Sequence, residues 1–402
     1  MTRAVRGRVL ITGDEDPTGR LTLAALRSLG RAGWMVGLAS PERGIGSSSR
    51  WATAWHPVPP SWFDPDGFVE GTEAAIKAGG YDIVFTGGDA GVLALSAARE
   101  SFSAKVPYPD IDVTTRAFDK LASVPDALAV GLAVPKVTPL TEDVIEEIRS
   151  PVMLKSRLHW TPGSPGGRAR LDPVIVRTPA EARARLAEIH AVGGDGFLQE
   201  IVPGGYKISY VSLLSPAGEV WAHSQQWTTW SWPPDRGHFT RGETMPIDPE
   251  LSRKSIAFLR RVGWYGLSEL EFLVSPSGEP QLIDFQGRYY GSMALAIAAG
   301  TDYPQLWAEA VLGDWSSDIQ PVPPLAAKPG YRYVRTESDL MRLLMERRGG
   351  LLRDAAGYVR YRTGAVGSLW SARDPVPAAW WSFHMSRRIS RRIVRRVRSR
   401  SK

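Results

Sequence analysis

The stretch LIDFQGRYYGS, residues 282–292, decides the fold that we predict for this chain. It begins as an apolar strand and then places an acid, an amide and an arginine close together. Side chains alternate across a strand, so Asp284, Gln286 and Arg288 share one face. Burying such a cluster without partners is costly, so the question is what this face meets.

The same stretch is the second half of a predicted hairpin. The sequence LSELEFLVSPSGEPQLIDFQGR, residues 267–288, has turn residues at 276–278, which brings Glu271 roughly opposite Asp284. Two carboxylates and the Gln286 amide then converge, and such oxygen ligands suit Mg²⁺. The local pattern is also typical of a solvent-facing strand whose charges are turned to water.

Composition limits the kinds of chemistry available to the chain. It has 402 residues, 43% hydrophobic and 23% charged, which is typical of an ordinary soluble globular protein with two or three packed units. The absence of cysteine excludes disulfides, thiolate metal sites and a cysteine nucleophile. The six histidines are scattered, and no HExxH or Ser-His-Asp pattern stands out.

The formal charge of +7 is concentrated at the C-terminal end. Residues 387–402 hold nine basic side chains and no acid, so the remainder carries 40 basic and 42 acidic residues. A nearly neutral body does not favour a nucleic-acid partner. The first residues lack the apolar core of a signal peptide, and no apolar run is long enough to span a bilayer, so we expect a cytoplasmic protein.

The basic tail, residues 386–402, needs its own explanation. Apolar residues recur every four positions on its predicted helix: Trp381, Met385, Ile389, Ile393 and Val397. A basic amphipathic helix with tryptophans at one end suits an anionic membrane surface, to which the protein would be peripheral. Nucleic acid or an acidic protein would also satisfy its arginines, and a solvated disordered tail remains the alternative.

The first region, residues 1–115, alternates strands and helices. Strands are predicted at 8–12, 34–40 and 81–86, and the helical patterns 21–33 and 92–101 follow two of them. This order predicts a small parallel sheet with covered faces. The glycines after the first strand do not form GxGxxG, so tight turns are the simpler explanation for them.

The middle region mixes strands and helices around a loop rich in Gly and Pro. The pattern predicts a helix at 118–137, a strand at 151–157 that carries Lys155, a mobile loop at 159–173, a helix at 178–190, a strand at 196–205, a strand pair at 208–227 and a helix at 251–263. A Pro-rich linker at 320–330 precedes a further strand and helix.

The order of the polar residues carries a resemblance. Lys120, Lys155, a glycine loop, the QE-apolar-apolar motif at 199–202 and Glu271 come before IDFQGRYYGS at 283–292. This order resembles the ATP-grasp superfamily, and in particular its carboxylate–amine ligases, whose final hairpin commonly has the sequence EFxxx…EINxRFWGS. The resemblance covers residues 110–315 well.

The resemblance implies an α/β chain in which an ATP-grasp domain of the α+β type follows a small parallel-sheet, Rossmann-like domain. The expected boundaries are 1–115 for the Rossmann-like domain, 116–318 for the nucleotide-binding and catalytic ATP-grasp domain, 319–385 for a C-terminal extension and 386–402 for the tail.

The resemblance also implies a role for each motif residue. Lys120 and Lys155 would contact the phosphates of ATP, with the loop at 163–170 closing over them. Adenine would lie against Gln199, Glu200 and Val202, through backbone groups of the last two. Mg²⁺ or Mn²⁺ would be held by Glu271, Asp284 and Gln286, and Arg288 would steady the acyl phosphate or the tetrahedral species. The alternatives are a surface lysine at 155 and a plain core strand at 199–202.

Two departures from the family pattern concern the metal and the ribose. The family usually has Glu at the position of Asp284 and Asn at that of Gln286, and we hypothesise that the shorter and the longer side chain compensate. Lys207 stands where a ribose-binding acid is expected.

The implied activity is an ATP-dependent ligation, in which a carboxylate becomes an acyl phosphate that an amine attacks. The products are ADP, phosphate and an amide, and the substrate is expected to be an amino acid or a similar small acid. The aromatic segment 225–244, with Arg236 and Arg241, either borders the acceptor pocket or packs on the sheet, and Tyr289 and Tyr290 would add an aromatic wall. The alternative function is nucleotide binding or membrane association on a degenerate ATP-grasp scaffold. Nothing in the sequence indicates an oligomeric state.

Overall fold

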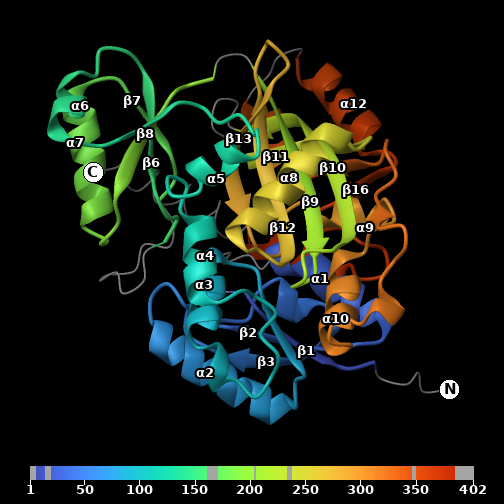
Figure 1. Ribbon diagram of the computed structural model, residues 1–402. Helices are drawn as coiled ribbons and strands as arrows, with labels where there is room; N and C mark the ends of the chain where they lie inside the picture. Colours follow the sequence, from blue (N-terminus) through green and yellow to red (C-terminus); the bar gives the residue numbers. More distant parts are fainter. Residues whose placement is uncertain are drawn as a thin grey trace, which may run out of the picture.

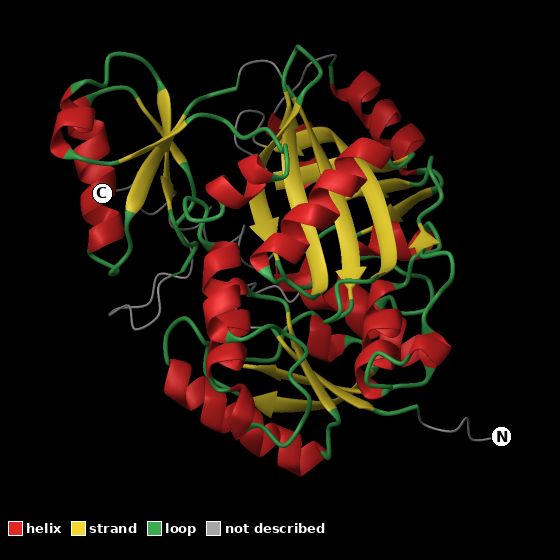
Figure 2. Cartoon of the chain, viewed as in Figure 1, coloured by secondary structure: helices red, strands yellow, loops and turns green. Residues whose placement is uncertain are grey.

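The computed structural model describes residues 6–13, 20–160, 171–202, 205–232, 238–345 and 350–384. These residues form a parallel sheet, a small antiparallel sheet and a large mixed sheet, with helices on their faces (Figures 1 and 2). The basic tail and the predicted phosphate-covering loop lie outside the described residues.

The first sheet has the strand order β3-β2-β1-β4 and is parallel throughout, which confirms the predicted parallel sheet. Its strands are β1 (Arg8–Thr12), β2 (Met35–Ser40), β3 (Ala52–Pro57) and β4 (Ile83–Thr86). Its helices are α1 (Arg20–Ala32), α2 (Pro65–Gly79), α3 (Asp89–Ala97) and α4 (Ile111–Phe118), with short 3₁₀ turns at Gly46–Ser48 and Arg99–Ser101.

The elements β3, α2 and α4 were not predicted from the sequence, although α2 has clear boundary signals. The Asp64 carboxylate accepts a hydrogen bond from the backbone N–H of Gly67, and Pro65 occupies the first helical turn. The helix ends at Gly80, whose φ of 59° is left-handed.

The small sheet has the order β5-β8-β6-β7 and carries Lys155 on a central strand. Its elements are β5 (Val137–Pro139), α6 (Glu142–Glu146), β6 (Val152–Ser156), β7 (Val174–Val176), α7 (Pro179–His190) and β8 (Gly196–Gln199). Leu154 and Ile189 belong to a hydrophobic core of this sheet alone. The small sheet therefore has a hydrophobic core separate from that of the other two sheets.

The predicted helix at 118–137 is mostly wrong. Only α5 (Val124–Ala129) forms there, because the Asp119 carboxylate accepts hydrogen bonds from the N–H groups of Leu121 and Ala122 and so stabilises a turn. The helix then stops before Gly131, whose φ is 79°.

The large sheet has the order β13-β12-β9-β10-β11-β15-β16, with β14 paired to β10. Its strands are β9 (Tyr206–Leu214), β10 (Val220–Trp232), β11 (His238–Met245), β12 (Gly266–Val274), β13 (Pro280–Gln286), β14 (Leu325–Ala326), β15 (Arg332–Val334) and β16 (Ala365–Gly367). The strand β14 lies inside the segment predicted as a Pro-rich linker, so part of that segment is sheet.

Helices pack on both faces of the large sheet. The remaining helices are α8 (Pro249–Val262), α9 (Met293–Ala298), α10 (Tyr303–Leu312), α11 (Thr336–Met345) and α12 (Leu351–Arg362), with a 3₁₀ turn at Ser317–Ile319. On one face the Tyr210 hydroxyl lies 2.9 Å from the Ser252 hydroxyl of α8, and on the other the Tyr303 hydroxyl of α10 donates to Ser224.

The first sheet and the large sheet share one hydrophobic core. Phe85 at the end of β4 packs against Tyr289 and Trp307, with ring centroids 5.3 Å and 4.6 Å away. This contact fixes the segment that follows β13 against the first sheet. Among the described residues, no helix is long and apolar enough to cross a bilayer.

Candidate active site

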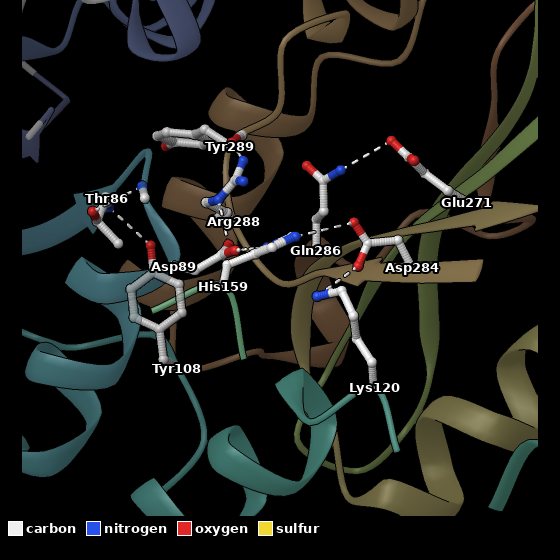
Figure 3. A network of polar contacts seen from close by, with 11 residues as sticks. Thr86, Asp89, Tyr108, Lys120, His159, Glu271, Asp284, Gln286, Arg288 and Tyr289 are labelled. Atoms are coloured by element: carbon white, nitrogen blue, oxygen red, sulfur yellow. Dashed lines mark hydrogen bonds and ion pairs between the residues drawn. The ribbon is translucent and has the colours of Figure 1, made fainter. Parts of the chain in front are cut away.

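The hairpin of β12 and β13 brings the three predicted metal ligands together. Glu271 pairs with Asp284 across the antiparallel strands, so the prediction that they lie roughly opposite is confirmed; a β-bulge between Glu271 and Phe272 makes the pairing direct. The Gln286 amide nitrogen donates to Glu271 Oε1 over 3.0 Å (Figure 3). Two carboxylates and one amide therefore converge at the end of this hairpin.

The two predicted phosphate lysines reach this point from different segments. Lys120 lies in the turn after α4, and its Nζ is 3.1 Å from Asp284 Oδ1. Lys155 of β6 donates to the backbone carbonyl of Ile283 over 3.2 Å. Lys155 is only 7% exposed, so the surface-lysine alternative is wrong.

Burial makes the Lys155 ammonium unusually acidic. Desolvation lowers its pKa to about 8, and the nearby charge of Asp284 opposes this shift in part. A buried ammonium of this kind gains much from an added anion, because it has little water to lose on binding one.

Arg288 is held by a carboxylate that the sequence analysis did not single out. Its Nε donates to Asp89 Oδ1 over 2.6 Å, and its Nη1 donates to the Tyr289 carbonyl. The guanidinium is 2% exposed, and Asp89 is the first residue of α3 in the parallel-sheet region. The first sheet therefore positions the predicted catalytic arginine.

His159 is a second residue that the sequence analysis missed. Its Nδ1 lies 2.9 Å from Asp89 Oδ2, and its Nε2 lies 3.9 Å from Asp284 Oδ2 (Figure 3). The imidazole thus connects the carboxylate that orients Arg288 with a predicted metal ligand. The only sequence signals were an acid after the strand-end glycines and a histidine opening a Gly/Pro-rich loop.

Glu269 is a further carboxylate beside the site. It accepts a hydrogen bond from the Gln226 amide over 3.1 Å, and the same amide donates to Ser292. Burial, followed by the charge of Glu271, raises the pKa of Glu269 to about 8. The period of two between Glu269 and Glu271 was the available signal.

The predicted adenine residues lie at the end of β8. Gln199 is buried there, and the backbone N–H of Glu200 donates to the Lys136 carbonyl over 2.9 Å. A contact from Glu200 to a base must therefore use its carbonyl. Val202 follows as a half-buried residue outside any strand, so the plain core-strand alternative does not describe 200–202.

The space at this site is narrow in the present structure. A slot of about 30 Å³ is lined by Lys120, Gln199 and Asp284, among others. A second space of about 10 Å³ touches Asp89, Lys120 and His159. Ligand pockets usually measure about 300–1,000 Å³, so both spaces are far smaller than the usual ligand pocket.

The aromatic segment 225–244 is a strand pair that packs against the C-terminal region. Arg241 donates twice to Asp339 Oδ2, at 3.0 and 2.8 Å, and its guanidinium lies over Trp230. The packing alternative therefore describes Arg241, while Arg236 lies outside the described residues.

The predicted aromatic wall of Tyr289 and Tyr290 is wrong. Both side chains are fully buried, and Tyr289 packs against the first sheet instead of lining a pocket.

The predicted donor set fits a hard divalent cation only if the amide takes part. Within the described ranges, no group of three or more His, Asp or Glu is placed to hold a metal ion. Glu271 and Asp284 supply two carboxylates, and Gln286 would supply its amide oxygen after the amide, whose nitrogen here donates to Glu271, has turned over. The Lys120 ammonium beside Asp284 marks this position as one that attracts positive charge.

No protein-family model matches the chain, and no curated protein sequence matches it either. Several solved structures are similar to the chain. The L-amino acid ligase from Bacillus licheniformis superimposes with a TM-score of 0.59 at 14% identity, over 80% of this chain and 79% of that one.

Two carboxylases are similar as well. The biotin carboxylase domain of 2-oxoglutarate carboxylase from Hydrogenobacter thermophilus, solved with MgADP and bicarbonate, gives a TM-score of 0.60 at 17% identity, covering 77% of this chain and 70% of that one. Pyruvate carboxylase from Rhizobium etli gives 0.59 at 16% identity over 76% of this chain, which spans 27% of that longer protein. These likenesses establish the fold.

Proposed function

We propose that this chain, which has the ATP-grasp fold predicted from its sequence, is an ATP-dependent ligase. It would transfer the γ-phosphoryl group of ATP to a carboxylate and join the resulting acyl group to an amine. The observation that carries the proposal is the convergence of Lys120, Lys155 and Arg288 with the ligands of the β12–β13 hairpin. The similar structures include an L-amino acid ligase and a domain solved with MgADP.

The lysines supply the positive charge that phosphoryl transfer needs. Positioning and charge neutralisation account for most catalysis of this kind. Lys155 is nearly dehydrated, so it interacts with phosphate oxygens more strongly than a surface lysine does. Lys120 is paired with Asp284 and would turn to the phosphates when that carboxylate binds a cation.

Glu271, Asp284 and Gln286 would hold Mg²⁺ or Mn²⁺. When bound, the ion would neutralise phosphate charge and help to orient the nucleotide. The carboxylates would orient the ion, and His159 beside Asp284 would limit the rotation of that side chain.

Arg288 would stabilise the acyl phosphate and the oxyanion that forms when the amine attacks. A preorganised charge in a buried site is effective because it needs no reorganisation during the reaction. Asp89 fixes the guanidinium in place. The reaction needs no side-chain nucleophile. The carboxylate oxygen takes the γ-phosphoryl group and ADP leaves; the amine then forms the amide bond and loses one proton, and the phosphate leaves with that carboxylate oxygen.

The substrates are proposed to be small molecules, with an amino acid or a similar small acid as the carboxylate. The tail would add contact with an anionic membrane surface.

The alternative is a nucleotide-binding or membrane-associated protein on a degenerate scaffold. Two observations favour it: the ion pair between Lys120 and Asp284, and the narrow slot of about 30 Å³ beside them. A closed, self-paired site would bind nucleotide without turning it over.

The test is ADP release from the full chain with Mg-ATP and pools of amino acids and small carboxylic acids. Substrate-stimulated release that is lost in Asp284→Ala supports the ligase. Nucleotide binding without turnover in every pool supports the degenerate scaffold. Binding of Mg-ATP that is unchanged in Asp284→Ala would refute the ligand assignment.

A further inference from the structure

A second cavity lies away from the proposed nucleotide site. Its volume is about 490 Å³, within the usual range for ligand pockets. It lies between α1, α9, the β15–β16 edge of the large sheet and the segment 367–372, and it shares no lining residue with the slot beside Lys120.

Small side chains create this space. Ala24 of α1, Ala294 and Ala298 of α9, and Ala365 and Gly367 of β16 line it, so neighbouring elements contact each other without filling the gap between them. In Figure 1, α9 lies between the large sheet and the helices of the first region.

A buried ion pair fixes the wall formed by the C-terminal segment. Arg27 of α1 donates to Asp374 Oδ2 over 2.8 Å and to the carbonyls of Leu369 and Asp374. Ser49 also donates to Asp374. Both charged side chains are almost fully buried, so this wall of the cavity is held in place.

Among the described residues, the lining combines arginines with apolar side chains and includes no acid. Arg362 contributes positive charge, the charge of Arg31 already acts on Asp302, and Ile297, Val366 and Trp370 contribute apolar surface. Within the part of the chain that the structure describes, Arg362 has no carboxylate partner; its Nη1 donates to the hydroxyls of Tyr358 and Thr336. Trp370 is 54% exposed, which is unusual for a residue of this size.

We propose that this cavity binds a small carboxylic acid with an apolar body. The carboxylate would pair with Arg362, because arginine binds carboxylates through two parallel hydrogen bonds. The apolar body would lie against Ala294 and Ala298 and beneath Trp370. This inference does not rest on the ligase reaction, because the two sites share no residue.

The helix α9 connects this cavity to the proposed active site through hydrogen bonds. Ser292 caps the start of α9, and its hydroxyl accepts from the Gln226 amide, which also donates to Glu269. A ligand that shifts α9 would therefore move a hydrogen-bonded chain that ends beside Glu271.

The experiment measures binding of octanoate and 3-phenylpropanoate to the full chain without ATP, by ligand-detected NMR and calorimetry. Octanamide and 3-phenylpropanamide serve as uncharged probes of the same shape. We expect the two acids to bind at least about tenfold more tightly than their amides, since a hydrogen bond between two charged groups is stronger than one to a neutral amide.

Three variants locate the site. Arg362→Gln should weaken acid binding by about tenfold, and Ala298→Phe should abolish it by filling the cavity. Arg353→Gln, on an exposed position of the same helix, should change nothing. Thermal unfolding of each variant verifies that it is folded. The proposal is overturned if neither acid binds, if the amides bind equally well, or if folded Arg362→Gln and Ala298→Phe retain full affinity.

Discussion

Replacing Asp89 by Asn tests how far the catalytic role of Arg288 depends on the carboxylate that positions it. The side chain keeps its size and loses its charge, so the guanidinium, which is 2% exposed, loses the carboxylate 2.6 Å away. Breaking a buried ion pair from one side costs about 3–5 kcal/mol, because the remaining charge stays buried. A displacement of a catalytic group by about 1 Å costs roughly 100-fold in rate. Asp89→Asn should therefore lower both the thermal midpoint and kcat for ADP release.

The double variant Asp89→Leu/Arg288→Met tests this reasoning. Replacing both charges with apolar groups should restore most of the lost stability, while activity stays absent because the arginine is gone. Glu100→Gln is the control, since Glu100 is a highly exposed acid of the same region. A single variant with wild-type stability and rate, or a double variant as unstable as the single one, would refute the argument.

Lys155→Met should raise the free energy of unfolding near pH 7 by about 3 kcal/mol. The reason is that the pKa of Lys155 is about 8 in the folded state and 10.5 in the unfolded chain, so the buried charge destabilises the fold. This gain in stability should shrink as the pH rises from 8 to 10.5, because the wild-type lysine loses its proton in the folded chain before it does so in the unfolded chain. Thermal unfolding of both proteins over this pH range measures the gain, and a gain that does not change with pH would contradict the prediction. Asp284→Glu and Gln286→Asn should each lower turnover more than the two changes together do, which a double-mutant cycle measures and additive losses would exclude. Removing 386–402 should abolish binding to anionic vesicles without lowering ADP release, and unchanged sedimentation with vesicles would end the membrane proposal.

The hairpin was predictable from its turn residues at 276–278, but its exact register was not. The pairing that starts at the turn would set Glu271 opposite Ile283, and a β-bulge beside Glu271 shifts the register by one residue, so that Glu271 pairs with Asp284. The parallel sheet followed in the same way from apolar strands and the helices after them. The resemblance of the motif order to the ATP-grasp superfamily associated Lys120 and Lys155 with this hairpin.

The partners that orient the site were not predictable, because they come from distant segments without a pattern of their own. Asp89 lies 199 residues before Arg288, and nothing near either residue indicates the other. The sequence allowed Arg241 to bind a substrate, but in the structure it pairs with Asp339 of α11, which lies 98 residues further along the chain. Burial of Lys155 likewise depends on how two sheets meet, which strand periodicity does not determine.

The pairing of Arg27 with Asp374 has a consequence for how the chain is made. These two residues are 347 positions apart, so a ribosome adding about 5–20 residues per second completes Asp374 roughly 20–70 seconds after Arg27. During that interval α1 carries a guanidinium whose final partner has not yet been synthesised. The helix α1 therefore reaches its final environment only after residue 374 has been translated. A ribosome-bound chain that stops before Asp374 should leave the Arg27 side chain without its protection from solvent.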